Sequence, residues 1–328
     1  KWAFVLVLLG LIVYVFRDMA GPIAKQLVKT SPWIVVLILV ATLLYGVFES
    51  TITMLFARQY NPTFTFRQAF GMTYFVSFYR TATLGSGAGV SALVYLNEYG
   101  VKTSEAFGMY MIELGIGIMA VILYLLHFHY MNETFAEYEA YIGIGFVATV
   151  IITICLLLFV CAGWFHQILK KLMNLVNYRG RFTEKFDKIK EQCDIMETES
   201  KELLRHWKLL LGVLLINICK FSCWFMIPYI VLYKSGAFSP DVALAITTVS
   251  VMLAAVIPTP AGIGSSEFVM IAMFGAIVGS AKAGAMALLY RFATFVFPCA
   301  LGAAYAAKVQ AESPVVDRWN EFMRDAMT

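Results

Sequence analysis

Long runs of apolar residues dominate the chain and predict helices that cross a membrane. A bilayer-spanning helix needs about 20 mostly apolar residues. Five runs meet this length, at residues 33–57, 103–128, 141–163, 209–233 and 281–307. The run at 2–16 is shorter, and because no small-residue cleavage site follows it, we expect a retained anchor rather than a cleaved signal peptide. The pattern predicts an all-α polytopic membrane protein with about six full spans.

Two further apolar regions are interrupted by residues that break helices. Region 68–99 is interrupted by GSGAG at 85–89, and region 241–279 is interrupted by PTPAGIG at 258–264. Proline lacks an N–H group and glycine adopts left-handed backbone angles, so both favour a turn at these places. We therefore expect each region to form a helical hairpin that re-enters the membrane. The residues expected to make the two breaks are Pro258, Pro260, Gly85, Gly87 and Gly89.

Positive charge is distributed unevenly between the segments that connect the spans. Residues 164–208 hold ten Lys or Arg, whereas residues 129–140 hold three Glu and no Lys or Arg. Cytoplasmic loops are enriched in Lys and Arg, so we expect the connector 164–208, the tail 308–328 and the N-terminus to be cytoplasmic in a bacterial-type plasma membrane. The region 17–32 then lies outside despite its basic residues, and it is the one exception. Apolar residues at helical spacing predict that the connector is amphipathic.

The number of crossings predicts that the two broken regions enter from opposite faces of the membrane. Region 68–99 must begin and end inside, and region 241–279 must begin and end outside, because the neighbouring spans fix both ends. Each half then has the order span, hairpin, span, with a first repeat at about 33–128 and a second at about 209–307 within one domain, 1–328. Inverted repeats with broken helices are typical of secondary transporters. We expect the two hairpin tips to meet near the midplane, where free backbone N–H groups suit an anion.

The composition supports a membrane location and argues against several classes of function. The chain is 60% hydrophobic and 14% charged, whereas soluble domains average about 45–50% and about 25%. Five of the six cysteines lie in apolar segments and are predicted to be buried thiols. The glycine motifs fit neither a dinucleotide-binding pattern nor a Walker pattern, and His127 and His129 diverge on a helix. We expect no cofactor, no metal and no nucleic-acid partner.

Six ionisable residues lie in or beside the predicted spans, where a charge costs about 2.5–3.5 kcal/mol at the bilayer centre. They are Glu49, Arg80, Glu113, Lys220, Glu267 and Arg291. Two interpretations stay open. The three acids and three bases could pair and neutralise one another, or they could line a polar cavity that binds the phosphate and the cationic part of a lipid headgroup. The second is favoured because the charges cluster around the two breaks.

Two motifs resemble a known family of membrane proteins. The stretch IPTPAGIGSSEFVMIAMFG (257–275) and the later ALLYRFATFVFPCALG (287–302) are similar to the lysylphosphatidylglycerol synthase transmembrane family, also called the flippase-like domain. The matching residues are Pro258, Pro260, Gly262, Gly264, Glu267, Tyr290 and Arg291. The first half departs from the family pattern because LGSGAG contains no proline. In known relatives a soluble domain aminoacylates a lipid that the membrane domain moves between leaflets, and the resemblance implies the translocating part without that soluble aminoacyl-transferase domain.

The residues and the resemblance together predict a lipid transporter of the flippase type. Arg291, Arg80 and Lys220 are the expected phosphate contacts, and Glu267 is expected to contact a cationic headgroup or to pair with Arg291. The other expected substrate-binding residues are Glu113, Gly262, Gly264 and Tyr290. One alternative is a membrane-embedded transferase or hydrolase with Glu267 as general base, and another is a scaffold whose charges only pair. Membrane lipids are the expected partners, while a homo-oligomer and a separate lipid-modifying enzyme are left open.

Overall fold

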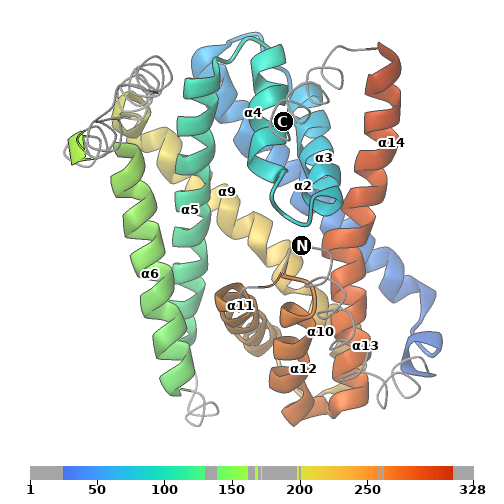
Figure 1. Cartoon of the computed structure of the whole chain (residues 1–328). Helices are drawn as coiled ribbons and strands as arrows, with labels where there is room; N and C mark the ends of the chain where they lie inside the picture. Colours follow the sequence, from blue (N-terminus) through green and yellow to red (C-terminus); the bar gives the residue numbers. More distant parts are fainter. Residues whose placement is uncertain are drawn as a thin grey trace, which may run out of the picture. The chain divides into compact units, whose positions relative to one another are not determined.

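The computed structural model describes residues 25–129, 139–161, 167–168, 171, 198, 201–257, 259 and 262–312 (Figure 1). Its elements are α2 (Pro32–Tyr60), α3 (Phe66–Ala82), α4 (Ala88–Glu98), α5 (Thr103–His129), α6 (Glu139–Cys161), α9 (Trp207–Phe225), α10 (Ile227–Leu232), η2 (Tyr233–Ser235), α11 (Pro240–Val256), α12 (Ser265–Val278), α13 (Ser280–Arg291), η4 (Phe292–Val296) and α14 (Phe297–Glu312). Of these, η2 is a 3-10 turn and η4 a π-helical turn. No strand occurs in the described residues, and the predicted all-α class is confirmed.

Four helical stretches are long and apolar enough to cross a membrane. They are Pro32–Tyr60, Thr103–Leu126, Trp207–Ser235 and Ser280–Ala307, and they agree with four of the spans predicted from the sequence. The helix α6 occupies the place of the predicted span 141–163. The predicted anchor at 2–16 and most of the connector and the tail lie outside the residues that the structure describes.

One face of α2 carries exposed apolar side chains that are suited to contact with lipid. Val36, Leu37 and Val40 are exposed, whereas Ile38 and Ile52 are fully buried. Because a helix satisfies its backbone hydrogen bonds internally, apolar side chains on its outer face can contact acyl chains at no polar cost. The buried face of the same helix packs on other helices of the protein.

The first broken region forms two short helices, α3 and α4, that pack against each other (Figure 1). A capping box starts α3, in which the Thr65 hydroxyl accepts from the Gln68 N–H and the Gln68 side chain accepts from the Thr65 N–H. The chain then turns at Leu84 and Gly85, both with positive φ (53° and 99°). The helix is therefore interrupted at residues 83–87, two residues earlier than GSGAG.

Gly87 lies within this turn, whereas Gly89 lies beyond it. Gly87 precedes α4 as its cap, and its N–H donates to the Thr83 hydroxyl oxygen at 2.7 Å. The Ser91 N–H donates to the Gly87 carbonyl at 2.9 Å, so helical bonding begins there. Gly89 consequently lies inside α4, and its assignment to the break was wrong because the helix starts earlier than the glycine pattern indicates.

The second broken region forms α11 and α12, which also pack side by side (Figure 1). α11 ends at Val256 and α12 begins at Ser265, so the helix is interrupted where the sequence predicts. Pro258 and Pro260 lie outside the described residues. Gly262 and Gly264 have φ of 67° and 85°, a region that side chains other than glycine rarely adopt. Glycine thus makes the return of the chain possible.

The described helices divide into two compact units, which we treat separately. The first unit comprises the described residues within 1–45, 124–146 and 221–298, and the second unit comprises the described residues within 46–123, 147–220 and 299–328. The limits expected from the sequence for the two repeats, and the expectation of a single domain, stay predictions.

Close helix contacts in the second unit depend on glycine. A side chain at Gly302 in α14 would overlap the backbone of Tyr74 in α3, and one at Gly71 in α3 would overlap the hydroxyls of Tyr305 and Tyr95. The hydroxyls of Tyr95 and Tyr305 share a hydrogen bond of 2.9 Å. Small residues of this kind allow helices to approach closely in a membrane, where apolar burial alone does not hold them together.

Candidate functional site

In the first unit, Glu267 stands at the start of α12 and its carboxylate makes three contacts. Its Oε2 accepts from the Gly264 N–H at 2.9 Å and from the Ser266 hydroxyl at 3.0 Å. Its Oε1 lies 3.3 Å from Nε of Arg291. A carboxylate in the first turn also interacts favourably with the positive end of the helix dipole. Both carboxylate oxygens are therefore engaged within the protein.

The turn before α12 is held by small polar side chains. The hydroxyls of Thr259 and Ser265 share a hydrogen bond of 2.8 Å, and the Ser265 hydroxyl also donates to the Gly262 carbonyl at 3.3 Å. Together with the positive φ of Gly262 and Gly264, these bonds orient the Gly264 N–H toward Glu267. The two predicted glycines thus position Glu267.

Arg291 lies at the end of α13, where the helix widens into the π-helical turn η4. Its guanidinium lies over the Phe295 ring, 4.2 Å from the centroid, in a cation–π contact. Pro298 cannot donate to the Thr294 carbonyl, which removes one α-helical hydrogen bond just past the turn. The Thr42 hydroxyl donates to the Ala293 carbonyl at 3.1 Å. Such π turns are often found at functional sites.

Aromatic side chains lie around the C-terminal end of α13. Tyr290 is buried and lies within electrostatic reach of Tyr45 and Arg291. Tyr45 stacks on Trp224 with ring centroids 3.5 Å apart. The Trp224 indole N–H is buried and has no hydrogen-bond partner among the described residues. Sequence reasoning named Tyr290 but missed Tyr45 and Trp224, because a lone aromatic in an apolar helix carries no distinguishing pattern.

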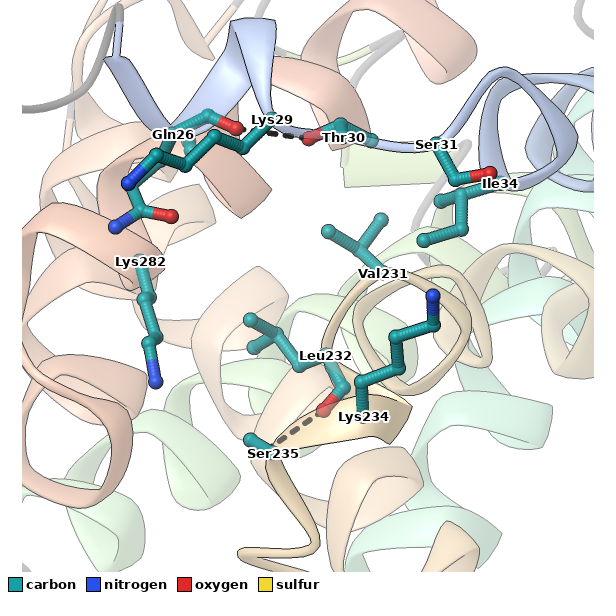
Figure 2. Close-up of a pocket in the computed structure, with 11 residues that line it drawn as sticks. Gln26, Lys29, Thr30, Ser31, Ile34, Val231, Leu232, Lys234, Ser235 and Lys282 are labelled. Atoms are coloured by element: carbon teal, nitrogen blue, oxygen red, sulfur yellow. Dashed lines mark hydrogen bonds between the residues drawn. The ribbon is translucent and has the colours of Figure 1, made fainter.

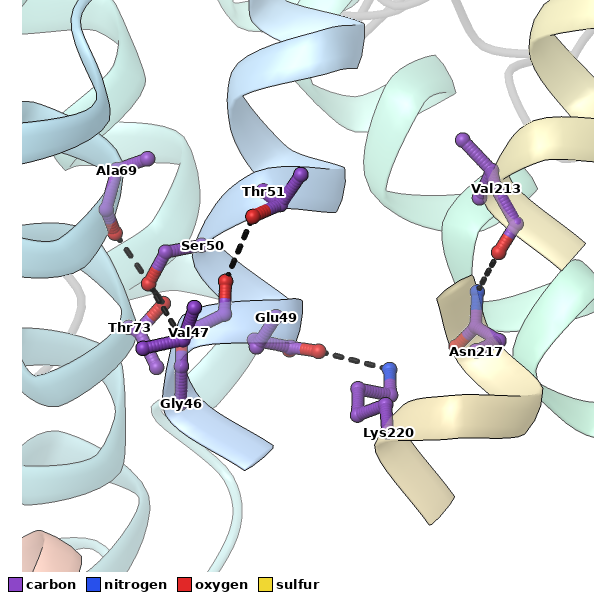
Figure 3. A network of polar contacts seen from close by, with 10 residues as sticks. All are labelled: Gly46, Val47, Glu49, Ser50, Thr51, Ala69, Thr73, Val213, Asn217 and Lys220. Carbon is purple, nitrogen blue, oxygen red and sulfur yellow. Dashed lines mark hydrogen bonds and ion pairs between the residues drawn. The ribbon is translucent and has the colours of Figure 1, made fainter. Parts of the chain in front are cut away.

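In the second unit, an ion pair connects α9 with α2 (Figure 3). Nζ of Lys220 lies 2.7 Å from Oε2 of Glu49, and the Lys220 side chain is only 6% exposed. One residue further along α2, the Ser50 hydroxyl shares a hydrogen bond of 3.0 Å with the Thr73 hydroxyl on α3. Lys220, expected to bind phosphate, therefore has the Glu49 carboxylate as a partner inside the protein.

Glu113 and Arg80 differ from this pair because their charges are not matched by direct partners. Glu113 on α5 is 9% exposed, and neither it nor the Arg80 guanidinium makes a side-chain hydrogen bond or ion pair with another described residue. Arg80 Nε is itself buried. Glu113 lies within electrostatic reach of Glu49 and Lys220.

Tyr110 connects these charges. It lies within electrostatic reach of Glu113, Glu49, Arg80 and Lys220. Gly89 brings the first turn of α4 against Tyr110, since a Cβ at this glycine would lie 3.7 Å from the Tyr110 ring. We name the cluster of Glu49, Arg80, Tyr110, Glu113 and Lys220 the polar cluster of the second unit.

Two residues of this region could have been found by their spacing. Tyr110 precedes Glu113 by three positions, and Asn217 precedes Lys220 by three, so each pair lies on one face of its helix. Asn217 is fully buried, and although its Nδ2 donates to the Val213 carbonyl at 3.0 Å, its Oδ1 has no partner among the described residues. Neither residue carries a charge that would distinguish it in an apolar segment.

The structure thus distributes the predicted site residues between the two units. The first unit holds Gly262, Gly264, Glu267, Tyr290 and Arg291, and the second holds Gly85, Gly87, Gly89, Arg80, Glu113 and Lys220. That the two helix breaks meet stays a prediction. Within the described residues, no three His, Cys, Asp or Glu side chains gather where they could hold a metal ion.

Comparison with known protein families finds a match over most of the chain. The family model described as the lysylphosphatidylglycerol synthase TM region matches residues 2–302. No curated protein matches the chain significantly. The family match covers most of the 328 residues, includes both helix breaks and the Tyr290–Arg291 motif, and indicates a lipid-related role in a membrane. The chain therefore belongs to the lysylphosphatidylglycerol synthase transmembrane family.

Proposed function

We propose that the protein moves a phospholipid headgroup between the leaflets of the membrane, as a flippase. The observation that carries this proposal is the polar cluster of the second unit. Glu113 and Arg80 lie in a helical membrane protein without direct partners among the described residues. A buried polar group without a partner is costly, and such groups in membrane proteins usually face a substrate path.

The charges of the cluster suggest which headgroup it takes. Glu49 and Lys220 neutralise each other through their ion pair. One positive group, Arg80, and one negative group, Glu113, are then left for the substrate. A guanidinium binds phosphate well, and a carboxylate suits an ammonium group. The cluster therefore fits a headgroup that contains both a phosphate and an amine, such as an aminoacylated or ethanolamine phospholipid.

Glu267 is better suited to holding the structure than to acting as a general base. A general base needs an oxygen within hydrogen-bond reach of the proton that it removes. Oε2 of Glu267 instead accepts from the Gly264 N–H and the Ser266 hydroxyl, and Oε1 is paired with Arg291. The role that we propose for Glu267 and Arg291 is to fix the start of α12 against the end of α13.

The proposal includes the topology expected from the sequence. The pairs α3–α4 and α11–α12 would enter the membrane from opposite faces as re-entrant hairpins, in an inverted repeat with both termini cytoplasmic. Two short helices that pack on each other and turn on glycines of positive φ support this topology. Labelling of single cysteines placed in the α3–α4 turn and near Gly262 by membrane-impermeant reagents would test it.

Leaflet movement in liposomes tests the function. The purified chain is reconstituted with a fluorescent phosphatidylethanolamine, and the fraction accessible to an impermeant quencher is followed in time. We expect movement in the wild type and a loss of about tenfold or more in Arg80→Gln and in Glu113→Gln, because each removes a charge-assisted contact. Arg205→Gln and Glu202→Gln remove the same groups at exposed positions and should leave the rate unchanged.

Two results would contradict the proposal. Equal rates in wild type, Arg80→Gln and Glu113→Gln would show that the polar cluster is not on the path. Absence of movement for every lipid, together with turnover of a lipid-linked donor, would favour the alternative of a membrane transferase. Thermal unfolding of each variant in detergent separates a lost function from a lost fold.

A further inference from the structure

A cavity of about 220 Å³ lies in the first unit, away from the Glu267–Arg291 pair, and three lysines line it. Figure 2 shows Lys29 and Lys282 on one side of the hollow and Lys234 on the other. The lysines come from the segment before α2, from η2 and from the first turn of α13. None of the described residues that line the cavity is acidic, so their net charge is positive.

The three amino groups are not neutralised by neighbours. None of Lys29, Lys234 and Lys282 forms an ion pair with a described acid, and all three are exposed. The Lys234 amine lies 5.9 Å from the centroid of the Tyr233 ring, which leaves its charge in place. Ser31 and Ser235 add hydroxyl groups to the lining. Amines and hydroxyls that surround a hollow are the donors that bind phosphate.

The backbone adds to the positive potential because two helices begin at the cavity. α2 begins at Pro32, next to Ser31, and α13 begins at Ser280, two residues before Lys282. Helix N-termini carry free N–H groups and a partial positive charge, which favour anions. The C-terminal end of η2 carries a partial negative charge instead, and the positive charge of Lys234 lies there. The cavity thus combines two helix starts with three lysines.

The surroundings of the cavity indicate a lipid rather than a dissolved anion. Ile34, Val231 and Leu232 form an apolar part of its wall. Trp33 and Tyr233, which directly adjoin lining residues, are 75% and 49% exposed. Exposed Trp and Tyr at the ends of spans mark the level of the headgroups in a bilayer. The lysines therefore lie where the phosphate of a phospholipid would be.

The cavity is also connected to the Glu267–Arg291 pair by one helix. Lys282 and Arg291 are nine residues apart on α13, a distance of about 13.5 Å along the helix axis. Ile34 and Ala285 both line the cavity, and Thr42 and Ala293, each eight residues further along, are joined by a hydrogen bond. α2 therefore meets α13 at the cavity and η4 at the Thr42–Ala293 hydrogen bond.

We propose that this cavity is a binding site for the phosphate of an anionic phospholipid headgroup, at the end of the membrane that the sequence predicts to face outward. The site explains why Lys29 breaks the positive-inside pattern, since its charge has a ligand to bind. The choice of a lipid rests on the proposed function, but the anion site itself does not.

Binding of a short-chain lipid to the purified full chain tests the site. In a neutral detergent, dioctanoylphosphatidylglycerol is titrated by calorimetry into the wild type and into the triple variant Lys29→Gln/Lys234→Gln/Lys282→Gln. We expect saturable binding by the wild type and a Kd raised about tenfold or more in the variant, with weaker binding at high salt. A Lys-to-Arg triple variant keeps the charges and should keep the affinity.

Controls separate this site from general attraction to positive charge and from the transport cluster. Lys102→Gln/Lys171→Gln/Lys208→Gln removes three exposed lysines elsewhere, and an equal loss of affinity in this variant would overturn the proposal. So would unchanged binding in the cavity variant. If the wild type binds the lipid and the cavity variant does not, but the wild type moves no lipid between leaflets, the result counts against the proposed function alone.

A last comparison distinguishes the two sources of phosphate. Glycerol 3-phosphate and inorganic phosphate are titrated under the same conditions. If these two ligands bind at least about tenfold more weakly than the lipid, the result supports a headgroup site, because burial of the acyl chains adds to the affinity of the lipid. Equal affinity of glycerol 3-phosphate would overturn the assignment to a lipid.

Discussion

Glu267→Gln is expected to destabilise the start of α12 because it removes one negative charge from three contacts. The charge is shared by the Gly264 N–H, the Ser266 hydroxyl and Arg291. A hydrogen bond to a charged group contributes about 1.5–3 kcal/mol, and breaking a buried pair costs about 3–5 kcal/mol. Glutamine keeps an acceptor for the Gly264 N–H, and the pair is 12% to 18% exposed. We therefore expect a loss of about 2–3 kcal/mol in the free energy of unfolding.

A double-mutant cycle isolates the pair from the other contacts. The wild type, Glu267→Gln, Arg291→Gln and the double variant are unfolded in mixed micelles by increasing the fraction of a denaturing detergent. Because the second substitution removes a charge that is already unpaired, the double variant should lose about 1–3 kcal/mol less than the sum of the single variants. Glu202→Gln, at an exposed position, serves as the control and should leave the stability unchanged.

Additivity would refute this reasoning. If the single losses add to within about 0.5 kcal/mol, Glu267 and Arg291 are not coupled in the folded protein. The account of Glu267 as the residue that fixes α12 against α13 would then be wrong, and a role in contact with a ligand would have to be reconsidered.

Three further changes test the packing of the helices in the same unfolding titration. Lys220→Gln is expected to destabilise the protein by leaving Glu49 unpaired, and Lys220→Gln/Glu49→Gln should recover part of the loss; a larger loss in the double variant would contradict this. Gly302→Val should lower the Tm because the side chain would overlap the backbone of α3, and an unchanged Tm would disprove that contact. Gly264→Ala should cost about 1–2 kcal/mol because its φ is positive, whereas Gly212→Ala, with open space around it, should be tolerated.

The spans could be predicted from the sequence because length and hydropathy decide them. A run such as 33–57 leaves few alternatives to a membrane helix, and α2 covers it from Pro32 to Tyr60. Helix ends depend instead on individual hydrogen bonds. The bond from Ser91 N–H to Gly87 places Gly89 inside α4, and no composition rule would show this.

Only part of the site could be predicted from the sequence. A charged residue in an apolar segment is easily recognised, but the sequence does not show which residue it contacts. Glu267 and Arg291 were recognised as exceptions in apolar segments, and their pairing is one of the two outcomes that the sequence allowed. The partner of Lys220 was not evident, because Glu49 is 171 positions away along the chain. Tyr110 was missed because tyrosine is common in membrane helices and gains its significance only from the charges around it.

The cavity with three lysines could not be predicted for a similar reason. Lys29, Lys234 and Lys282 are far apart in the sequence and each lies beside the end of a span, where lysine is ordinary. Only the packing of α2, η2 and α13 brings them to one hollow. The unexpected charge of the region 17–32 was the single signal in the sequence that pointed to it.

The most direct test of the central claim is the headgroup preference of leaflet movement. Rates are measured in liposomes for fluorescent phosphatidylethanolamine, which carries an amine, and for phosphatidylglycerol, which does not. If Arg80 binds the phosphate and Glu113 binds the amine, Glu113→Gln should slow the amine-bearing lipid by about tenfold or more and affect phosphatidylglycerol much less. Equal rates for the wild type and Glu113→Gln with both lipids would contradict the account.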